Sequence, residues 1–240
     1  MAQQVQKITR LSCLEGAGKA TGLVVIIDVF RAFSCAPLFF YFGANRVILE
    51  ADPDKALELK HQIPSSILAG EVNEVPIKGG DMGNSPTEAI SKGRAFFEGK
   101  TVIHRTTAGV TGVHAASGHR DTILLGSFVT ASSIAKYIKG SRALEVSLVA
   151  MGTRGKAPSP EDEACADYIE HLVTGKPYDH VAAMERIVFH ESAKKFIMGT
   201  KPYLPREDPI FCLQRDVFDF VIIAEKRGGL LEAKMVRGQK

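Results

Sequence analysis

The sequence predicts an α/β fold, layered α/β/α, in which helices cover a largely parallel sheet. Short β-branched runs alternate along the chain with segments whose apolar residues recur at helical spacing, and this alternation is typical of parallel sheets with crossover helices. The 240 residues are 45% hydrophobic and 24% charged, a composition that excludes disordered and fibrous proteins. A chain of this length can bury a core without disulfide support.

The expected elements follow from these patterns in chain order. Seven apolar runs predict strands at 23–27, 46–50, 66–69, 101–104, 122–125, 145–150 and 218–224. Helical spacing predicts helices at 53–61, 131–138 and 161–172. Asp52 before Pro53 and Ser159 before Pro160 mark two helix starts, because an N-cap side chain accepts hydrogen bonds from the first turn and proline is tolerated there.

We expect two lobes, residues 1–115 and 116–240, joined near 112–120, with the functional site between them. Basic and acidic residues are scattered and leave a net charge of +3, which argues against a nucleic-acid partner. No apolar run is long enough to span a bilayer, and residues 1–10 lack the apolar region of a signal peptide. These observations predict a cytoplasmic protein that does not bind a membrane.

Several familiar motifs are absent or incomplete. The four cysteines form no Cys-x-x-Cys pair and are expected to be buried thiols: Cys13, Cys35, Cys165 and Cys212. Residues 16–20 resemble a P-loop, but the leading glycine and the metal-binding hydroxyl are missing, so we expect a surface turn. Serine-hydrolase and cysteine-phosphatase motifs are also missing. His104 is the histidine best placed for catalysis, and a structural hydrogen-bonding role is equally consistent with its position.

Asp28 and Arg31 follow the buried run 23–27. In open α/β sheets, ligands bind beyond the carboxyl ends of the strands. There a carboxylate can hold a divalent cation, and an arginine can bind phosphate oxygens with two donors. This pair therefore predicts phosphate chemistry.

Two further clusters follow the same rule. Glu71 comes after the run 66–69 and Gly70, where the glycine is expected to turn the backbone. Its carboxylate would face the same cleft. Asn84 and Ser85 indicate either an anion-binding turn or the cap of a following helix.

Polar residues also follow the run 101–104. Thr106, Thr107 and Gly109 suit a turn that presents hydroxyls and amides to phosphate, and a polar turn without a ligand is the alternative. Glu161 and Asp162 begin a helix and are either surface groups that favour the helix dipole or part of a site. The recurrence of such clusters favours one shared site.

In order, the motifs are Ile27-Asp28-Val29-Phe30-Arg31-Ala32, Gly70-Glu71, Gly83-Asn84-Ser85-Pro86, Thr106-Thr107-x-Gly109, Gly126-Ser127-Phe128 and Glu161-Asp162. This series resembles the 2-phosphosulfolactate phosphatase family over roughly residues 24–170. The resemblance implies a two-lobed α/β phosphatase that uses magnesium and releases phosphate and 3-sulfolactate from 2-phospho-3-sulfolactate, a step toward coenzyme M. The chain departs from the family pattern at Val72, Ala108, Val110 and Thr130. The resemblance thus predicts the reaction type and leaves recognition of the sulfonate end open.

The expected mechanism is metal-assisted hydrolysis of a phosphomonoester. Mg²⁺ is the expected cofactor because the candidate ligands are hard oxygens, from Asp28, Glu71, Glu161 and Asp162. The candidate phosphate-binding residues are Arg31, Asn84, Ser85, Thr106, Thr107 and Gly109, and the candidate catalytic residues are Asp28, Arg31, Glu71 and Asp162. Either a water attacks phosphorus, or Asp28 attacks it directly and forms an acyl phosphate.

Two other functions fit the same residues: a magnesium-dependent phosphotransferase or lyase acting on another small phosphorylated acid, and an anion-binding module without catalysis. The basic residues of the last third are either solvated charges or a positive rim for the substrate: Lys194, Lys195, Lys201 and Arg206. The expected partner is a small phosphorylated anion. A symmetric homodimer is the default expectation for such a protein.

Overall fold

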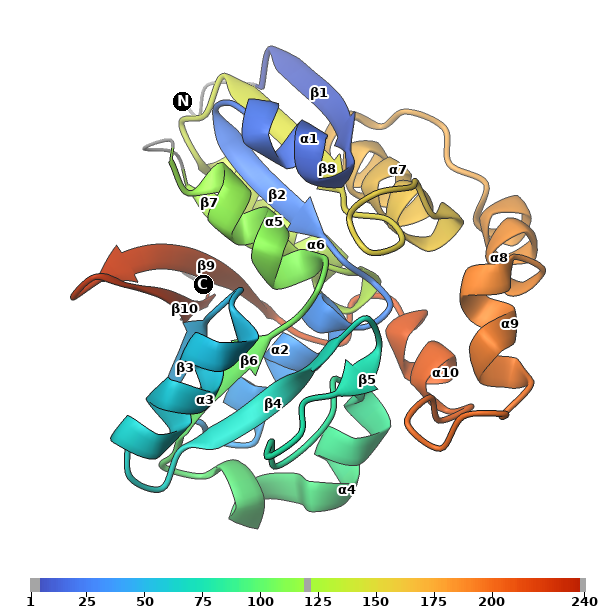
Figure 1. Ribbon diagram of the computed structural model, residues 1–240. Coiled ribbons are helices and arrows are strands. Elements are labelled where there is room, and N and C mark those ends of the chain that lie inside the picture. Colours follow the sequence, from blue (N-terminus) through green and yellow to red (C-terminus); the bar gives the residue numbers. More distant parts are fainter. Residues whose placement is uncertain (1–4, 119–121, 238–240) are drawn as a thin grey trace.

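The computed structural model describes residues 5–118 and 122–237, and within these ranges the strands form one ten-stranded sheet (Figure 1). The strand order is β1-β8-β2-β7-β9-β10-β3-β6-β4-β5. The strands are β1 Lys7–Ser12, β2 Leu23–Ile27, β3 Arg46–Leu49, β4 Ile67–Val72, β5 Val75–Pro76, β6 Thr101–Arg105, β7 Ile123–Gly126, β8 Glu145–Ala150, β9 Phe220–Arg227 and β10 Leu230–Arg237. The mixed α/β architecture and the largely parallel sheet confirm the expected fold class.

Two parallel half-sheets make up most of this sheet. The first half-sheet contains β1, β8, β2 and β7, and the second contains β3, β6 and β4. The β9–β10 hairpin lies between them and pairs antiparallel with β7 on one side and with β3 on the other. The two half-sheets therefore run in opposite directions, and Figure 1 shows their carboxyl ends approaching each other in the middle of the molecule.

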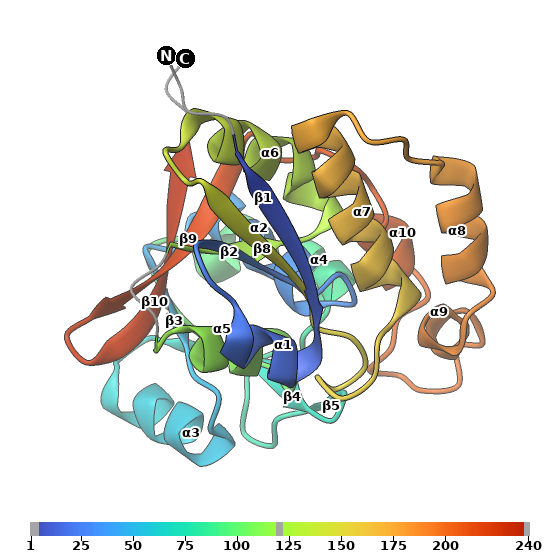
Figure 2. The same ribbon diagram turned by 90° about the horizontal axis from the view of Figure 1, so that it is seen from above.

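Helices cover both faces of the first half-sheet (Figures 1 and 2). The helices are α1 Cys13–Lys19, α2 Ala32–Tyr41, α3 Pro53–Gln62, α4 Pro86–Phe97, α5 Gly109–Ala116, α6 Ala131–Gly140, α7 Pro160–Thr174, α8 His180–Val188, α9 Glu191–Ile197 and α10 Asp208–Cys212. Val24 and Ile26 of β2 pack in the core beneath α1 and α5, and Val25 and Ile27 pack in the core beneath α6 and α7. Because β2 is covered on both faces, its sequence is an unbroken apolar run.

The second half-sheet is also covered on both faces. Ala56 of α3 packs with Leu68 and Ile103 on one face, and Phe39 of α2 and Phe97 of α4 belong to the core on the other face. Helices α8, α9 and α10 form a cap segment, residues 180–212, which lies beside the carboxyl ends of the strands (Figure 1). This cap segment completes the surroundings of the site.

The seven predicted strands and three predicted helices are confirmed, with bounds that shift by at most a few residues. Asp52 caps α3 as expected, since its side chain accepts hydrogen bonds from the amides of Asp54 and Lys55. Ser159 occupies the N-cap of α7, but its hydroxyl makes no capping hydrogen bond. The sequence patterns did not reveal β1, β5 and β10, nor α1, α2, α5 and the helices of the cap segment.

Three local predictions are wrong. Residues 16–19 belong to α1 rather than to a surface turn, and Gly16 is buried because its missing Cβ lets α1 pack against Leu11. Gly70 does not turn the chain: it pairs with Arg105 inside β4, where a Cβ would collide with the Arg105 carbonyl. Cys13, at the start of α1, is partly exposed rather than buried. The other three cysteines are buried thiols as expected.

The expected two lobes are not confirmed, because strands from both halves of the chain share one sheet. The split at residue 115 stays a prediction. Within the expected joining segment, residues 112–116 belong to α5, whereas 119 and 120 lie outside the described residues. No helix in the described ranges has the length and apolarity needed to cross a membrane, and the cytoplasmic location stays a prediction.

Candidate active site

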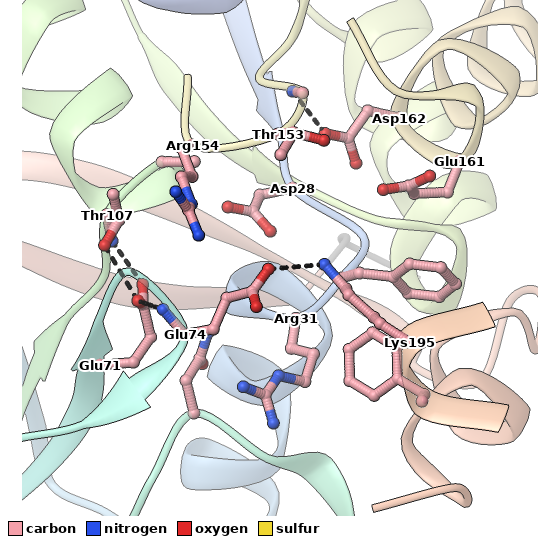
Figure 3. A pocket seen from close by; sticks show the side chains of 15 residues that line it. Asp28, Arg31, Glu71, Glu74, Thr107, Thr153, Arg154, Glu161, Asp162 and Lys195 are labelled. Carbon is pink, nitrogen blue, oxygen red and sulfur yellow. Dashed lines mark hydrogen bonds and ion pairs between the residues drawn. The ribbon is translucent and has the colours of Figure 1, made fainter. Parts of the chain in front are cut away.

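A pocket lies where the carboxyl ends of the two half-sheets approach each other (Figure 3). Its free volume of about 50 Å³ has room for a few water molecules. Seven of the ten residues that the sequence predicts for the site line it: Asp28, Arg31, Glu71, Asn84, Thr107, Glu161 and Asp162. The other lining residues are Phe30, Glu74, Ala108, Gly152, Thr153, Arg154, Lys195 and Phe196. Distant segments of the chain therefore meet in one cavity.

Asp28 follows the last residue of β2 and is 6% exposed. Its Oδ1 accepts a hydrogen bond from the amide of Ala32, the first residue of α2, at 3.2 Å. The amide of Gly109, at the start of α5, also bonds to the carboxylate. Burial raises the pKa of Asp28 to about 6, and the negative charges of Glu71 and Glu161 add to this, whereas the amide bonds oppose it.

Asp162 and Glu161 enter the pocket from the first turn of α7. The Asp162 oxygens accept hydrogen bonds from the amides of Val29 and Gly152, each at 2.7 Å. Burial raises the pKa of Asp162 well above its usual range, and the charges of Glu161 and Asp28 contribute to this rise. Glu161 is buried and accepts a hydrogen bond from the Ser192 hydroxyl of α9 at 2.7 Å.

Glu71 reaches the pocket from the end of β4, in the second half-sheet. One carboxylate oxygen accepts the amide of Thr107 at 2.5 Å. The other accepts the Thr107 hydroxyl at 2.9 Å and the amide of Glu74 at 2.5 Å. Arg105 donates to the Glu71 carbonyl. These bonds fix Glu71 to the loop after β6 and to the β4–β5 turn (Figure 3).

Arg31 lines the pocket, but its charge is already balanced. The guanidinium donates to Asp208 at 3.0 Å and to the Tyr203 carbonyl at 2.9 Å, and it lies 5.4 Å from the centre of the Phe196 ring. Asp208, which is completely buried, also accepts the Ser85 hydroxyl at 2.7 Å. This network joins the loop after β2 to the cap segment. Sequence reasoning missed Asp208 because an isolated acid before proline carries no recognisable signal.

Asn84 is oriented by a buried histidine. The Nε2 atom of His104 lies 3.2 Å from the Oδ1 atom of Asn84. Burial lowers the pKa of His104 to about 3, so the ring is neutral and Nε2 must carry the proton it donates. The Asn84 amino group has no hydrogen-bond partner among the described residues and is left to the pocket. His104 does not line the pocket, which favours the structural role for it.

Three predicted phosphate-binding residues do not line the pocket. Ser85 caps α4, with its hydroxyl 3.2 Å from the Glu88 amide, as one of the two sequence interpretations has it. The Thr106 hydroxyl accepts the amide of Val110 at 2.9 Å. Gly109 packs against Asp28, and a Cβ there would lie 2.8 Å from the Asp28 Oδ2 atom. These three residues lie next to the pocket and stabilise the segments that carry its lining residues.

The pocket also contains charged residues that sequence reasoning did not assign to it, or left open. Glu74 comes from the β4–β5 turn and pairs with Lys195 of α9 at 2.8 Å. Arg154 comes from the loop after β8 and points into the same space (Figure 3). For Lys195, the position in the pocket favours the positive-rim interpretation, whereas Lys194 pairs with Glu191 on the exposed side of α9.

The carboxylates fit a hard divalent cation by their chemistry. Asp28 and Asp162 are buried acids with raised pKa values, and neither forms an ion pair with a basic residue in the described part of the chain. A cation bound nearby would stabilise their charged forms. Across residues 5–118 and 122–237, no three Asp, Glu, His or Cys side chains are grouped so that they could hold an ion together. Ion binding would therefore require side chains to change rotamer.

The fold and site define an α/β protein with an acidic pocket at the carboxyl ends of its strands. The family model described as 2-phosphosulpholactate phosphatase matches residues 11–227. The chain belongs to this family.

Relatives that share one name come from several organisms. A protein of Bacillus subtilis (strain 168) named probable 2-phosphosulfolactate phosphatase is 32% identical over 207 residues, covering 85% of this chain and 87% of the relative. A protein of the same name from Clostridium perfringens (strain SM101 / Type A) is 31% identical over 214 residues, with 83% and 84% covered. The one from Thermoplasma volcanium (strain ATCC 51530 / DSM 4299 / JCM 9571 / NBRC 15438 / GSS1) is 27% identical over 197 residues, with 82% and 86% covered.

Replacing Asp208 by Asn should destabilise the protein strongly. Asp208→Asn leaves the Arg31 charge buried without a counter-charge, and breaking such a pair costs about 3 kcal/mol. Urea unfolding of the variant and the wild type measures this loss. The matched control is Glu207→Gln, an exposed neighbour, which should change the free energy of unfolding very little. Equal stability of both variants would show that the Arg31–Asp208 pair is unimportant for the fold.

The buried neutral His104 should make the protein less stable in acid. The pKa of His104 falls from 6.5 to about 3 on folding, so between these values the unfolded chain binds a proton that the folded chain rejects. Stability is then lost as the pH falls through this range, by about 1.4 kcal/mol per pH unit. Between pH 6.5 and 5 the wild type should lose about 2 kcal/mol more than His104→Gln. His61→Gln, at an exposed position, should follow the wild type, and parallel curves for all three proteins would contradict the assignment.

Proposed function

We propose that this protein is a phosphatase that hydrolyses the phosphate ester of a small hydroxy acid, with 2-phospho-3-sulfolactate converted to 3-sulfolactate and phosphate. The observation that carries the proposal is the shared pocket: four buried carboxylates meet the side chains of Asn84 and Arg31, which keep donors without a partner among the described residues. The family and the names of its relatives support the same reaction. The cytoplasmic location and the homodimer are part of this proposal.

The departures from the family pattern are compatible with catalysis. Val110 and Thr130 are fully buried, and neither lines the pocket. Val72 packs beside the core cluster beneath α3. Ala108 does line the pocket. A single small side chain there enlarges the space for substrate and removes none of the carboxylates, so no observation favours a binding module over an enzyme.

We further propose that the enzyme uses Mg²⁺, held by a subset of Asp28, Glu71, Glu161 and Asp162. When bound, the ion would offset the negative charge that grows on the leaving oxygen and would help to orient the attacking water. Glu161 is well suited to this role because, among the residues that the structure describes, Ser192 bonds to one of its oxygens and the other is left for the ion. Asp162 is held by two backbone amides, and this fixes the direction in which its remaining lone pairs point.

The chain's own residues would bind and align the phosphate. The Asn84 amino group, oriented by His104, donates to a phosphate oxygen. Arg31 keeps donors beyond those that bond to Asp208 and Tyr203. The Thr107 hydroxyl and Glu71 lie at the opposite wall. A phosphate held between these walls would be exposed to Asp28, which either attacks phosphorus itself or orients the water that does so.

Phosphate release tests the proposal directly. With Mg²⁺, the purified protein should liberate phosphate from 2-phospho-3-sulfolactate, and Asp28→Asn should abolish this because it removes the central carboxylate. Circular dichroism would check that the variant stays folded. Omission of divalent metal should also stop turnover. A panel of phosphorylated hydroxy acids that yields no phosphate with several divalent metals would contradict the hydrolase proposal.

The configuration at phosphorus should distinguish the two routes of attack. We expect inversion, the result of a single displacement by water, because the Asp28 carboxylate already accepts two backbone amide hydrogen bonds, which weaken it as a nucleophile. An isotopically chiral phosphate ester reports the outcome. Retention would mean two displacements and hence an acyl phosphate on Asp28.

A further inference from the structure

We propose that Lys195 and Arg154 form a second anion-binding subsite, which takes an acidic group of the substrate other than its phosphate. The proposal rests on the proposed function, in that the same pocket receives a phosphate ester. It assigns Lys195 and Arg154 as the residues that select for this acidic group. Glu74 is the counter-ion that occupies this subsite when no substrate is bound.

The geometry places this subsite over the carboxylates. The Lys195 ammonium extends from α9 into the pocket and meets Glu74 at 2.8 Å. Figure 3 shows Glu74 between Lys195 and Arg154, with Asp28 close by. The side chains of Glu74 and Lys195 are 22% and 27% exposed. Such partial exposure leaves their charges open to exchange with a ligand that arrives from solvent.

The backbone holds Glu74 in an unusual conformation. Its φ is +77°, directly after Asn73 at +50°. Asparagine tolerates the left-handed region, whereas glutamate adopts it rarely and at an energetic cost. The Glu74 amide bonds to the Glu71 carboxylate at 2.5 Å, which helps to maintain this conformation. Strain of this kind is characteristic of functional sites, and here it directs the side chain toward Lys195.

Positive charge exceeds negative charge around Glu74. Its carboxylate pairs with the Lys195 ammonium, and the charges of Lys201 and Arg154 also act on it. No described residue forms an ion pair with Arg154, which is exposed. One carboxylate thus faces three cations. An anionic group that displaced Glu74 would meet net positive charge from these three side chains.

The position of the Glu74–Lys195 pair supports displacement. The pair spans the space between the β4–β5 turn and the cap segment, inside the pocket that the carboxylates line. An acidic group that enters the pocket therefore meets this pair and competes with Glu74 for Lys195.

The test measures binding rather than turnover, with phosphonates that cannot be hydrolysed. Calorimetry in Mg²⁺ compares phosphonoacetate, which carries a carboxylate, with methylphosphonate, which does not. The wild type should prefer phosphonoacetate, and Lys195→Met should reduce this preference about tenfold, as expected for loss of one charged contact. Arg154→Gln should act in the same direction. Glu74→Gln should have the opposite effect and bind phosphonoacetate more tightly, because Lys195 loses its internal competitor.

The neighbouring lysine provides a matched control. Lys194 lies on the same helix, pairs with Glu191 at 3.5 Å and does not line the pocket, so Lys194→Met should keep the wild-type preference. Thermal unfolding checks that all variants are folded. The proposal is overturned if the wild type shows no preference, if Lys195→Met weakens both phosphonates equally, or if Glu74→Gln weakens phosphonoacetate binding as Lys195→Met does. Preference without phosphate release would refute only the hydrolase, and phosphate release without preference would refute only the subsite.

Discussion

The burial of several negative charges in one small space is the constraint on which this structure depends. Asp28, Glu161 and Asp162 are each less than 7% exposed, and desolvation of charged groups is costly unless hydrogen bonds compensate for it. The compensation comes from backbone amides, of Ala32 and Gly109 for Asp28 and of Val29 and Gly152 for Asp162. The loops around the pocket therefore adopt conformations in which their backbone amides point at these carboxylates.

The arrangement of the sheet makes this concentration of charge possible. In a sheet whose strands all run the same way, the loops after the strands lie in a row along one edge. Here the β9–β10 hairpin reverses the direction between the half-sheets, and loops from both half-sheets nevertheless line a single pocket. Asp28 and Asp162 belong to one side, and Glu71 and Thr107 belong to the other. The cap segment then adds Lys195, which pairs with Glu74.

The sequence predicted what is local and missed what depends on tertiary contact. The run 23–27 identified a strand because burial on both faces leaves an unbroken apolar pattern. The sequence patterns did not predict β1 because it is a half-exposed edge strand rich in polar residues. Asp28 and Glu71 were found from their place at strand ends, but Thr106 shows that sequence does not reveal which side of a turn a hydroxyl faces. The Glu74–Lys195 and Arg31–Asp208 pairs join positions more than a hundred residues apart, and no local pattern encodes them.

The position of the hairpin in the chain has a consequence for biosynthesis. β9 and β10 follow every other described strand in the sequence, yet they occupy the centre of the sheet. Until β9 and β10 have left the ribosome, β7 and β3 each have an unpaired edge in the nascent chain. Open edges of this kind pair with other chains and promote aggregation. The pocket lies between the half-sheets that this hairpin joins, so a chain truncated before β9 would leave these edges open and would be aggregation-prone.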